Sequence, residues 1–244
     1  MKVNGHYSLG LEDTDRVNHA VGGGIPEGSL VLIEGVDGAG KSVWTQRMCY
    51  GMAEEDTYIA YVSTELTAAD FMQQMHSLSY DIVEHMLSGQ VLFLHADVDT
   101  HRGGDRRELL SKLTEPSTLW QGDVIVVDAF SAFLRNDPRF DAIAAHGDED
   151  HEMESVLTFL QGMTSRGKTV VLTADPEATT ERALRPIRST ADVFMQIETE
   201  EVGQEIRRNV RVRRFSNMKQ PVDDGIAFNV QQGRGLTIVN RTIA

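Results

Sequence analysis

One glycine-rich stretch carries the clearest chemistry in the chain, the run Gly35-Val36-Asp37-Gly38-Ala39-Gly40-Lys41-Ser42. It satisfies every fixed position of the phosphate-binding pattern G-x-x-x-x-G-K-[ST]. The glycines allow successive backbone N–H groups to converge on one point and surround phosphate oxygens. We expect Lys41 to reach the β- and γ-phosphates and the Ser42 hydroxyl to complete the coordination shell of Mg²⁺. The loop therefore predicts a site for a nucleoside triphosphate with Mg²⁺.

A second candidate is the carboxylate of Asp128, which ends the run DVIVVD. This run is continuously apolar up to its last residue, which is typical of a parallel strand buried on both faces. With a phosphate-binding loop upstream, Asp128 is interpreted as a Walker B acid that holds Mg²⁺ through water or through Ser42. The plainer alternative is an aspartate that caps a strand-to-loop turn.

In many P-loop ATPases a catalytic glutamate follows the Walker B acid, but in this chain an alanine follows Asp128. Glu65 is the candidate base, because it comes just after a predicted strand, at the sheet end where the phosphate loop also opens. A carboxylate there could orient or deprotonate an attacking water. As the alternative, Thr64 or Glu65 caps a helix that starts near Ala68.

The predicted site combines three sets of residues. The catalytic candidates are Glu65, Lys41 and Asp128, and the metal ligands are Ser42 and Asp128. The predicted nucleotide-binding residues are Gly35, Asp37, Gly38, Ala39, Gly40, Lys41, Ser42 and Val43.

Further polar residues admit two interpretations each. Thr173 and Asp175 follow a predicted strand and could face the γ-phosphate as polarity sensors, or serve only the turn around Pro176. Arg213 or Arg214, in the arginine-rich run IRRNVRVRRF, could reach a nucleotide on a neighbouring subunit as an arginine finger. Alternatively, this run is an exposed strand whose arginines pair with surface carboxylates.

Two other features suggest little chemistry. The segment from His146 to His151 contains acids and two histidines, which could bind a metal but more often form a solvated acidic face. Cys49 is the lone cysteine, so it cannot form an internal disulfide and is interpreted as a packing residue.

Composition limits the class of protein. A length of 244 residues suits one large α/β domain, expected over residues 1–244. The net charge of −14 argues against unspecific attraction to DNA or anionic lipid. Lysine supplies only five of the 23 cationic side chains, and abundant carboxylates with scarce lysine resemble proteins of salt-loving archaea. The chain shows neither an apolar run long enough to span a membrane nor a signal peptide, so we expect a cytoplasmic protein.

Strand and helix patterns alternate along most of the chain. The predicted strands are 29–34, 57–63, 91–96, 123–128 and 169–173, and the predicted helices are 41–53, 68–78, 106–113 and 152–165, after a short helix within 9–18. This order predicts an α/β fold with a doubly wound parallel sheet, whose ligands bind at the carboxyl ends of the strands. From Asp192 onward, alternating runs joined by turn residues predict antiparallel strands that extend the sheet.

These motifs together resemble the RecA superfamily, and within it the single-domain relatives of the circadian-clock ATPase. The resemblance covers nearly the whole chain and is carried by GGGIPEGSLVLIEG, the phosphate loop, YVSTE, VIVVDAFS, TVVLTADP and TADVFMQIE. The first of these, the ending FNVQQGRGLTIV and the single ATPase copy are similar to the accessory ATPases of the archaeal flagellum (archaellum) motor.

The resemblance implies a RecA-like P-loop fold, with ATP bound at Gly35 to Ser42 and at Asp128. It also implies a ring beneath the membrane platform protein of the motor, contact with the motor's hexameric assembly ATPase, and recruitment to the membrane through that complex. Hydrolysis is expected to be weak or absent, because the clock ATPases carry paired glutamates where this chain has Glu65-Leu66.

Three functions follow as alternatives. The first is a nucleotide-gated assembly module of the archaellum motor, in which ATP favours the assembled state. The second is a clock-like or signalling ATPase with real turnover. The third is a recombinase-like DNA-binding ATPase, which the missing helical DNA-binding module and the missing basic stripe disfavour.

Overall fold

The structure is a computed structural model that describes residues 5–98, 109–115, 117–137, 149–202 and 205–239. The strands of its main sheet are β3 (Leu30–Glu34), β4 (Ile59–Ser63), β5 (Val91–His95), β6 (Val124–Asp128), β7 (Thr169–Ala174), β8 (Val193–Val202), β9 (Glu205–Phe215), β10 (Gly225–Gln231) and β11 (Gly235–Ile238). Within the described residues these nine strands form one sheet in the order β11-β10-β9-β8-β3-β7-β6-β4-β5.

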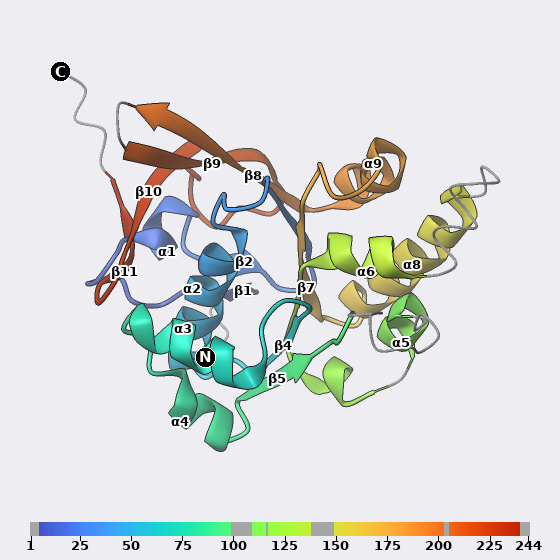
Figure 1. Ribbon diagram of the computed structural model, residues 1–244, viewed down its shortest axis with the longest axis horizontal. Coiled ribbons are helices and arrows are strands. Elements are labelled where there is room, and N and C mark those ends of the chain that lie inside the picture. The colour runs from blue at the N-terminus through green and yellow to red at the C-terminus, as the bar shows by residue number, and fades with distance from the viewer. Residues whose placement is uncertain (1–4, 99–108, 116, 138–148, 203–204, 240–244) are drawn as a thin grey trace.

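Helices cover both faces of this sheet (Figure 1). One face is packed by α2 (Lys41–Glu54), α3 (Ala68–Ser77) and α4 (Ile82–Leu87). The other is packed by α5 (Leu109–Thr114), the short helix η2 (Thr118–Gln121), α6 (Phe130–Asn136), α8 (Glu149–Thr164) and α9 (Glu181–Thr190). The strands between them are apolar on both sides: in β3, Val31 and Ile33 enter one core and Leu30 and Leu32 the other.

The central strands β8, β3, β7, β6, β4 and β5 are mutually parallel. Their carboxyl ends therefore meet at one edge, where ligands bind in open α/β sheets. The register places Ser63 of β4 opposite Asp128 of β6. Gly35, just beyond β3, donates its N–H to the carbonyl of Ala174 at the end of β7. This edge brings together the chain segments after four strands.

The C-terminal strands extend the sheet as an antiparallel unit. β9 pairs antiparallel with both β8 and β10, and β10 pairs antiparallel with β11. One detail of the prediction is wrong, because β8 itself runs parallel to β3. The chain thus adds β8 to the parallel sheet first and reverses only at β9.

The segment before the phosphate loop differs from the predicted short helix within residues 9–18. It forms turns until α1 (Val17–Ala20), and the flanking strands β1 (His6–Tyr7) and β2 (Ile25–Pro26) form a small antiparallel sheet. The glycines around residue 23 have positive φ angles, which continues the turn as expected.

A buried ion pair fixes this segment to α2. The Arg47 guanidinium pairs with the Asp15 carboxylate, and both side chains are almost fully buried. Arg47 also donates to the carbonyl oxygens of Leu9 and Gly10. Because every polar group in the cluster has a partner, the cost of burying the charges is offset locally.

The other predicted elements match the observed bounds closely, except that α8 begins three residues before the predicted start at 152. The predicted helix at 106–113 lies partly outside the described residues, and its described part belongs to α5. Cys49 is buried, and burial raises the pKa of its thiol to about 12, which agrees with a packing role. Each helix of the described residues is too short or too polar to span a bilayer.

Candidate functional site

The glycine-rich loop connects β3 to α2 at the carboxyl edge of the sheet. Gly38 and Gly40 have φ angles of 72° and 102°, which other residues rarely adopt. Gly40 is also the N-cap of α2, and no side chain caps this helix end. The unpaired N–H groups of the first helical turn therefore face the loop, as required for binding an anion.

The side chain of Lys41 is folded back over this loop. Its ammonium group donates to the carbonyl oxygens of Gly35 at 2.8 Å and Val36 at 2.9 Å, and Lys41 is buried. These contacts keep a positive charge directly beside the concave surface of the loop. A phosphate entering the loop meets this charge without a large movement of the chain.

Asp128 lies opposite the loop and accepts hydrogen bonds from three hydroxyl groups. Thr173 donates at 2.6 Å and Ser42 at 3.3 Å to Oδ1, and Tyr61 donates at 2.8 Å to Oδ2. The Tyr61 hydroxyl in turn lies 3.1 Å from that of Thr45. Burial, and then the Asp128 charge, raise the pKa of Tyr61 well above its usual value, so this phenol stays protonated and remains a donor.

Ser42 and Asp128 form a donor set suited to Mg²⁺. Hydroxyl and carboxylate oxygens are the hard ligands that this ion prefers, and the remaining positions are commonly filled by water and phosphate. The Ser42 hydroxyl is already directed at the Asp128 carboxylate. The residues present therefore fit a hydrated Mg²⁺ next to a phosphate group.

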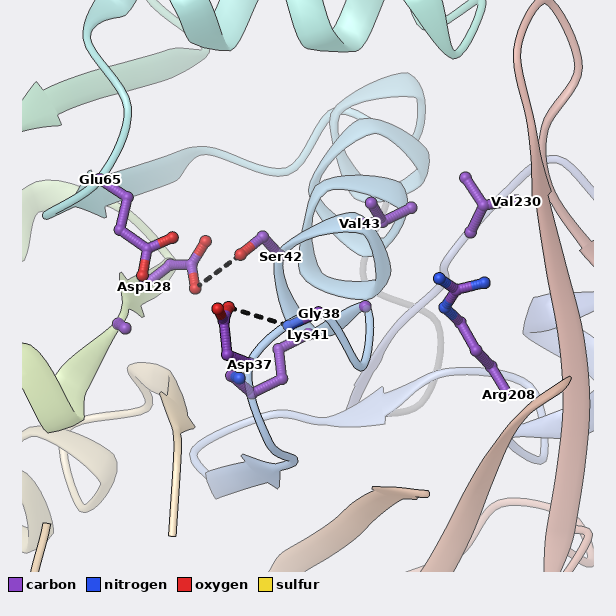
Figure 2. A pocket seen from close by; sticks show the side chains of 11 residues that line it. Asp37, Gly38, Lys41, Ser42, Val43, Glu65, Asp128, Arg208 and Val230 are labelled. Carbon is purple, nitrogen blue, oxygen red and sulfur yellow. Dashed lines mark hydrogen bonds between the residues drawn. The ribbon is translucent and has the colours of Figure 1, made fainter. Parts of the chain in front are cut away.

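Glu65 lies on the same wall of the pocket as Asp128 (Figure 2). Desolvation at the wall raises the pKa of Glu65, and the Asp128 and Asp37 charges raise it further, whereas Lys41 lowers it. The alternative that Glu65 caps the following helix is wrong. Thr67 is the N-cap of α3 and forms a capping box with Asp70.

Thr64 is likewise no helix cap, since its hydroxyl accepts a hydrogen bond from the backbone N–H of Ala129. Thr173 is buried and donates to Asp128, so it supports this carboxylate directly. Asp175 forms a turn instead, accepting a hydrogen bond from the N–H of Glu177, and does not line the pocket.

The arginines of strand β9 fall into three groups according to what their side chains contact. Arg211 and Arg213 pair with Glu198 of the neighbouring strand β8 at 3.1 and 3.3 Å. Arg214 donates to carbonyl oxygens at the end of α9, including that of Ala191 at 2.7 Å. Arg208 lines the pocket beside the loop, a placement that we did not predict.

Together these residues enclose a cavity of about 250 Å³. Its lining residues are Asp37, Gly38, Gly40, Lys41, Ser42, Val43, Glu65, Asp128, Ala129, Arg208 and Val230. Of the predicted nucleotide-binding residues, Gly35 and Ala39 support the loop from behind: Ala39 is fully buried, and Gly35 packs against the Ile197 carbonyl. All predicted catalytic and metal-binding residues lie on this one cavity.

The acidic segment from His146 to His151 lies outside the residues whose side chains the structure describes. Among the side chains that are described, no group of three or more histidine, cysteine or carboxylate residues could hold a metal ion. In that part of the chain, the pair Ser42 and Asp128 is our candidate for a metal site.

Comparison with known proteins places the chain in a family. The family model described as "ATPase: KaiC" matches residues 9–242. The archaeal flagellar ATP-binding protein FlaH of Methanocaldococcus jannaschii is 28% identical over 94% of this chain and 94% of its own length. FlaH of Methanococcus voltae is 24% identical over 95% of this chain and 96% of its own length.

A solved structure agrees with these relatives. The crystal structure of the flagellar accessory protein FlaH from M. jannaschii has a TM-score of 0.85 and 27% identity, and the match covers 96% of this chain and 99% of that one. The RecA-like fold with its antiparallel C-terminal extension is therefore confirmed. The chain belongs to the KaiC family of ATPases, and over nearly its whole length it is similar to the archaeal flagellar protein FlaH.

Proposed function

We propose that this protein binds ATP with Mg²⁺ in the cavity between the glycine-rich loop and Asp128. The observation that carries this proposal is the arrangement of the cavity. An uncapped helix N-terminus and Lys41 face the hydroxyl–carboxylate pair of Ser42 and Asp128 across it. Anions bind at such helix ends, and Mg²⁺ binds at such oxygen pairs. FlaH relatives described as ATP-binding proteins support the same ligand.

Each residue has a distinct part in this site. The loop N–H groups would hold the phosphates, and the Lys41 ammonium would exchange its two loop carbonyls for phosphate oxygens. Ser42 and Asp128 would hold the metal ion, which neutralises phosphate charge when bound. Tyr61 and Thr173 keep the Asp128 carboxylate in a fixed orientation.

At the level of the cell, we propose a cytoplasmic, nucleotide-gated component of the archaellum motor. Occupancy by ATP would favour assembly into a ring beneath the membrane platform and contact with the motor ATPase, with hydrolysis slow or absent. ATP can shift this equilibrium only if it binds the assembled state more tightly than the free chain. The archaeal flagellar names of the relatives support this setting.

Sedimentation velocity tests the assembly proposal. The free chain is compared with the chain in Mg²⁺ and ATP, alone and with the purified motor ATPase, in high-salt buffer. We expect larger species, or a tighter complex with the motor ATPase, only in the presence of ATP. Unchanged self-association and unchanged partner binding would contradict a nucleotide-gated module.

One observation favours a second candidate, an ATPase with real turnover. Glu65 lies on the wall of the cavity near Asp128, where a carboxylate can orient or deprotonate water. Under this alternative, steady phosphate release is abolished by Glu65→Gln while ATP binding persists. Phosphate release that is absent from the wild type, or equal in both proteins, would exclude Glu65-dependent turnover.

A further inference from the structure

A second hollow lies at the end of the sheet opposite the glycine-rich loop. It has a volume of about 510 Å³, and we call it the amino-end pocket. Gln121 on its wall comes shortly before β6, and Lys168 comes directly before β7. These two strands are parallel, so the pocket lies at their amino ends, whereas the loop and Asp128 lie at the carboxyl edge. The lining residues that matter here are Trp120, Phe159, Gly162, Met163, Arg166 and Lys168.

The walls of the amino-end pocket are apolar and held in place. The indole Nε1–H of Trp120 donates to the carbonyl of Leu113 at 2.9 Å, which fixes the ring. The Phe159 ring meets the Trp120 ring edge to face, with 4.9 Å between the ring centroids. Phe159 and Met163 are both partly buried against the same core cluster. Small-molecule sites are typically lined by such apolar and aromatic side chains, with few polar groups.

Gly162 leaves open space at the helical wall of the pocket. It lies inside α8, where a glycine costs helix stability relative to alanine. Within the described part of the chain, no atom would lie within 4 Å of a Cβ added at this position. A larger side chain at residue 162 would therefore occupy the pocket without displacing a neighbour.

Two cationic side chains border the pocket, although the net charge of the chain is −14. The Lys168 ammonium donates to the carbonyl oxygens of Gln121 at 3.1 Å and Gly122 at 2.7 Å, which leaves one of its three N–H groups available. Arg166 is exposed. Among the ion pairs between described residues, none involves Arg166 or Lys168. The pocket therefore combines an aromatic wall with positive charge that is not compensated locally.

We propose that the amino-end pocket binds a small aromatic carboxylate, with its ring against the paired aromatic side chains and its carboxylate at Lys168 and Arg166. The volume lies within the range of small-molecule sites, about 300–1,000 Å³. Aromatic rings pack favourably against such pairs, and hydrogen bonds from charged donors to a carboxylate are the strong ones. Salt screens the more distant surface carboxylates, so the two adjacent cations dominate the local field. This site is separate from the nucleotide site and does not depend on it.

The test uses NMR on the full chain, labelled with ¹⁵N at tryptophan, in high-salt buffer. The chain has two tryptophans, and Trp44 is fully buried in the other core cluster. The Trp120 indole signal therefore reports on the pocket, and the Trp44 signal reports on the fold. Three probes are titrated: naphthylacetate, its neutral amide and the cation naphthylethylamine. A capped peptide of similar chemistry, acetyl-Asp-Phe-Asp-amide, tests whether the occupant is instead a polypeptide.

We expect naphthylacetate to shift the Trp120 signal saturably and to bind about ten-fold more tightly than the amide, and the amine not to bind. Gly162→Leu, which fills the pocket, should abolish binding. Lys168→Met should largely remove the preference for the carboxylate over the amide. Lys219→Met, which changes an exposed lysine outside the pocket, is the matched control and should behave as the wild type. The Trp44 signal should stay in place throughout, which shows that each variant is folded.

Three results would overturn the inference. A Trp120 signal that naphthylacetate does not shift, or equal binding in Gly162→Leu, would show that the pocket is not a ligand site. An amide or amine that binds as tightly as the carboxylate would remove the role of the two cations. Tighter binding by the peptide than by naphthylacetate would assign the pocket to a polypeptide. None of these results bears on ATP binding, so they leave the proposed function standing.

Discussion

At the scale of single residues, the carboxylate of Asp128 is held from three directions. Ser42 and Thr173 donate to one oxygen and Tyr61 to the other, and Asp128 itself is buried. Hydroxyl groups fix its orientation without neutralising its charge. The negative charge is therefore available to a metal ion beside the loop.

The consequence is a metal-dependent effect of Asp128→Asn. An asparagine keeps the shape but removes the charge that would hold Mg²⁺, so we expect ATP affinity to fall by about ten-fold in Mg²⁺ and much less in EDTA. Titration with a fluorescent ATP analogue measures both. Asp175→Asn, the same change at a turn outside the cavity, should bind as the wild type. Equal losses with and without metal would argue against the metal-binding role.

Glu65 makes a prediction about stability and pH. Its pKa is raised in the folded protein, first by desolvation and then by Asp128, so ionisation of Glu65 opposes folding. The folded state loses stability as pH rises from the ordinary glutamate pKa through the raised one. Glu65→Gln should therefore raise the thermal midpoint at neutral pH, and the gain should shrink as pH approaches the ordinary pKa. A lower midpoint at neutral pH would contradict this environment for the carboxylate.

At the scale of elements, α2 connects the phosphate loop to the N-terminal segment. Besides the Asp15–Arg47 pair, the helix is packed closely at Gly51. A Cβ at this position would lie 1.8 Å from the Leu9 carbonyl oxygen and 2.3 Å from the Arg47 side chain. The segment before the loop can approach α2 only because residue 51 is a glycine.

Two glycine substitutions distinguish the effect of this close packing on stability from the effect of helix propensity. Gly51→Ala should lower the free energy of unfolding by about 1–3 kcal/mol or more, because backbone atoms of Leu9 must move. Gly162→Ala is the control on α8, where no atom lies within 4 Å of the added Cβ. It should raise the free energy of unfolding by about 0.5–1 kcal/mol. Urea denaturation measures both, and a neutral Gly51→Ala would contradict the close contact.

The sequence predicted the central strands well, because their apolar runs and short flanking turns are local signals. Helices with weak local signals were missed. α4 spans only Ile82–Leu87, and its N-cap residue makes no side-chain capping bond. α6 starts just after β6, again without a side-chain cap, and α9 contains Pro186, which ordinarily breaks a helical pattern.

In the candidate site, too, the residues with a local sequence signal were predicted and a residue without one was missed. The loop from Gly35 to Ser42 is contiguous, so its residue types and their spacing were sufficient to predict it. Arg208 reaches the cavity from a distant strand, and its placement there depends on sheet register. One signal was present: Arg208 alternates in phase with Val210 and Val212, unlike Arg211 and Arg213. This alternation alone could not show which element packs against that face of the strand.

At the scale of the whole molecule, the charge is strongly unbalanced. The net charge is −14, and carboxylates outnumber basic side chains by 37 to 23. Mutual repulsion of like charges destabilises a compact state, and salt screens it over a short distance. The balance of charges thus makes ionic strength a determinant of stability.

We expect the thermal midpoint of unfolding to rise steadily from low salt to molar KCl. Differential scanning calorimetry measures the midpoint, with sucrose at matched osmolality as a control for exclusion effects that do not depend on charge. A midpoint that is constant or falls with KCl would contradict an acidic surface adapted to salt.

The most direct test of the central claim is an equilibrium titration of the wild type and Lys41→Ala with ATP and Mg²⁺ at high ionic strength. In the wild type, ATP should bind saturably at the glycine-rich loop, at one site per chain. Removal of the ammonium group should weaken binding at least about ten-fold, since hydrogen bonds to charged groups are the strong ones. Lys168→Ala, whose ammonium binds the Gly122 carbonyl away from the cavity, should bind as the wild type. No saturable binding by the folded wild type, or equal affinity in Lys41→Ala, would contradict a nucleotide site at this loop.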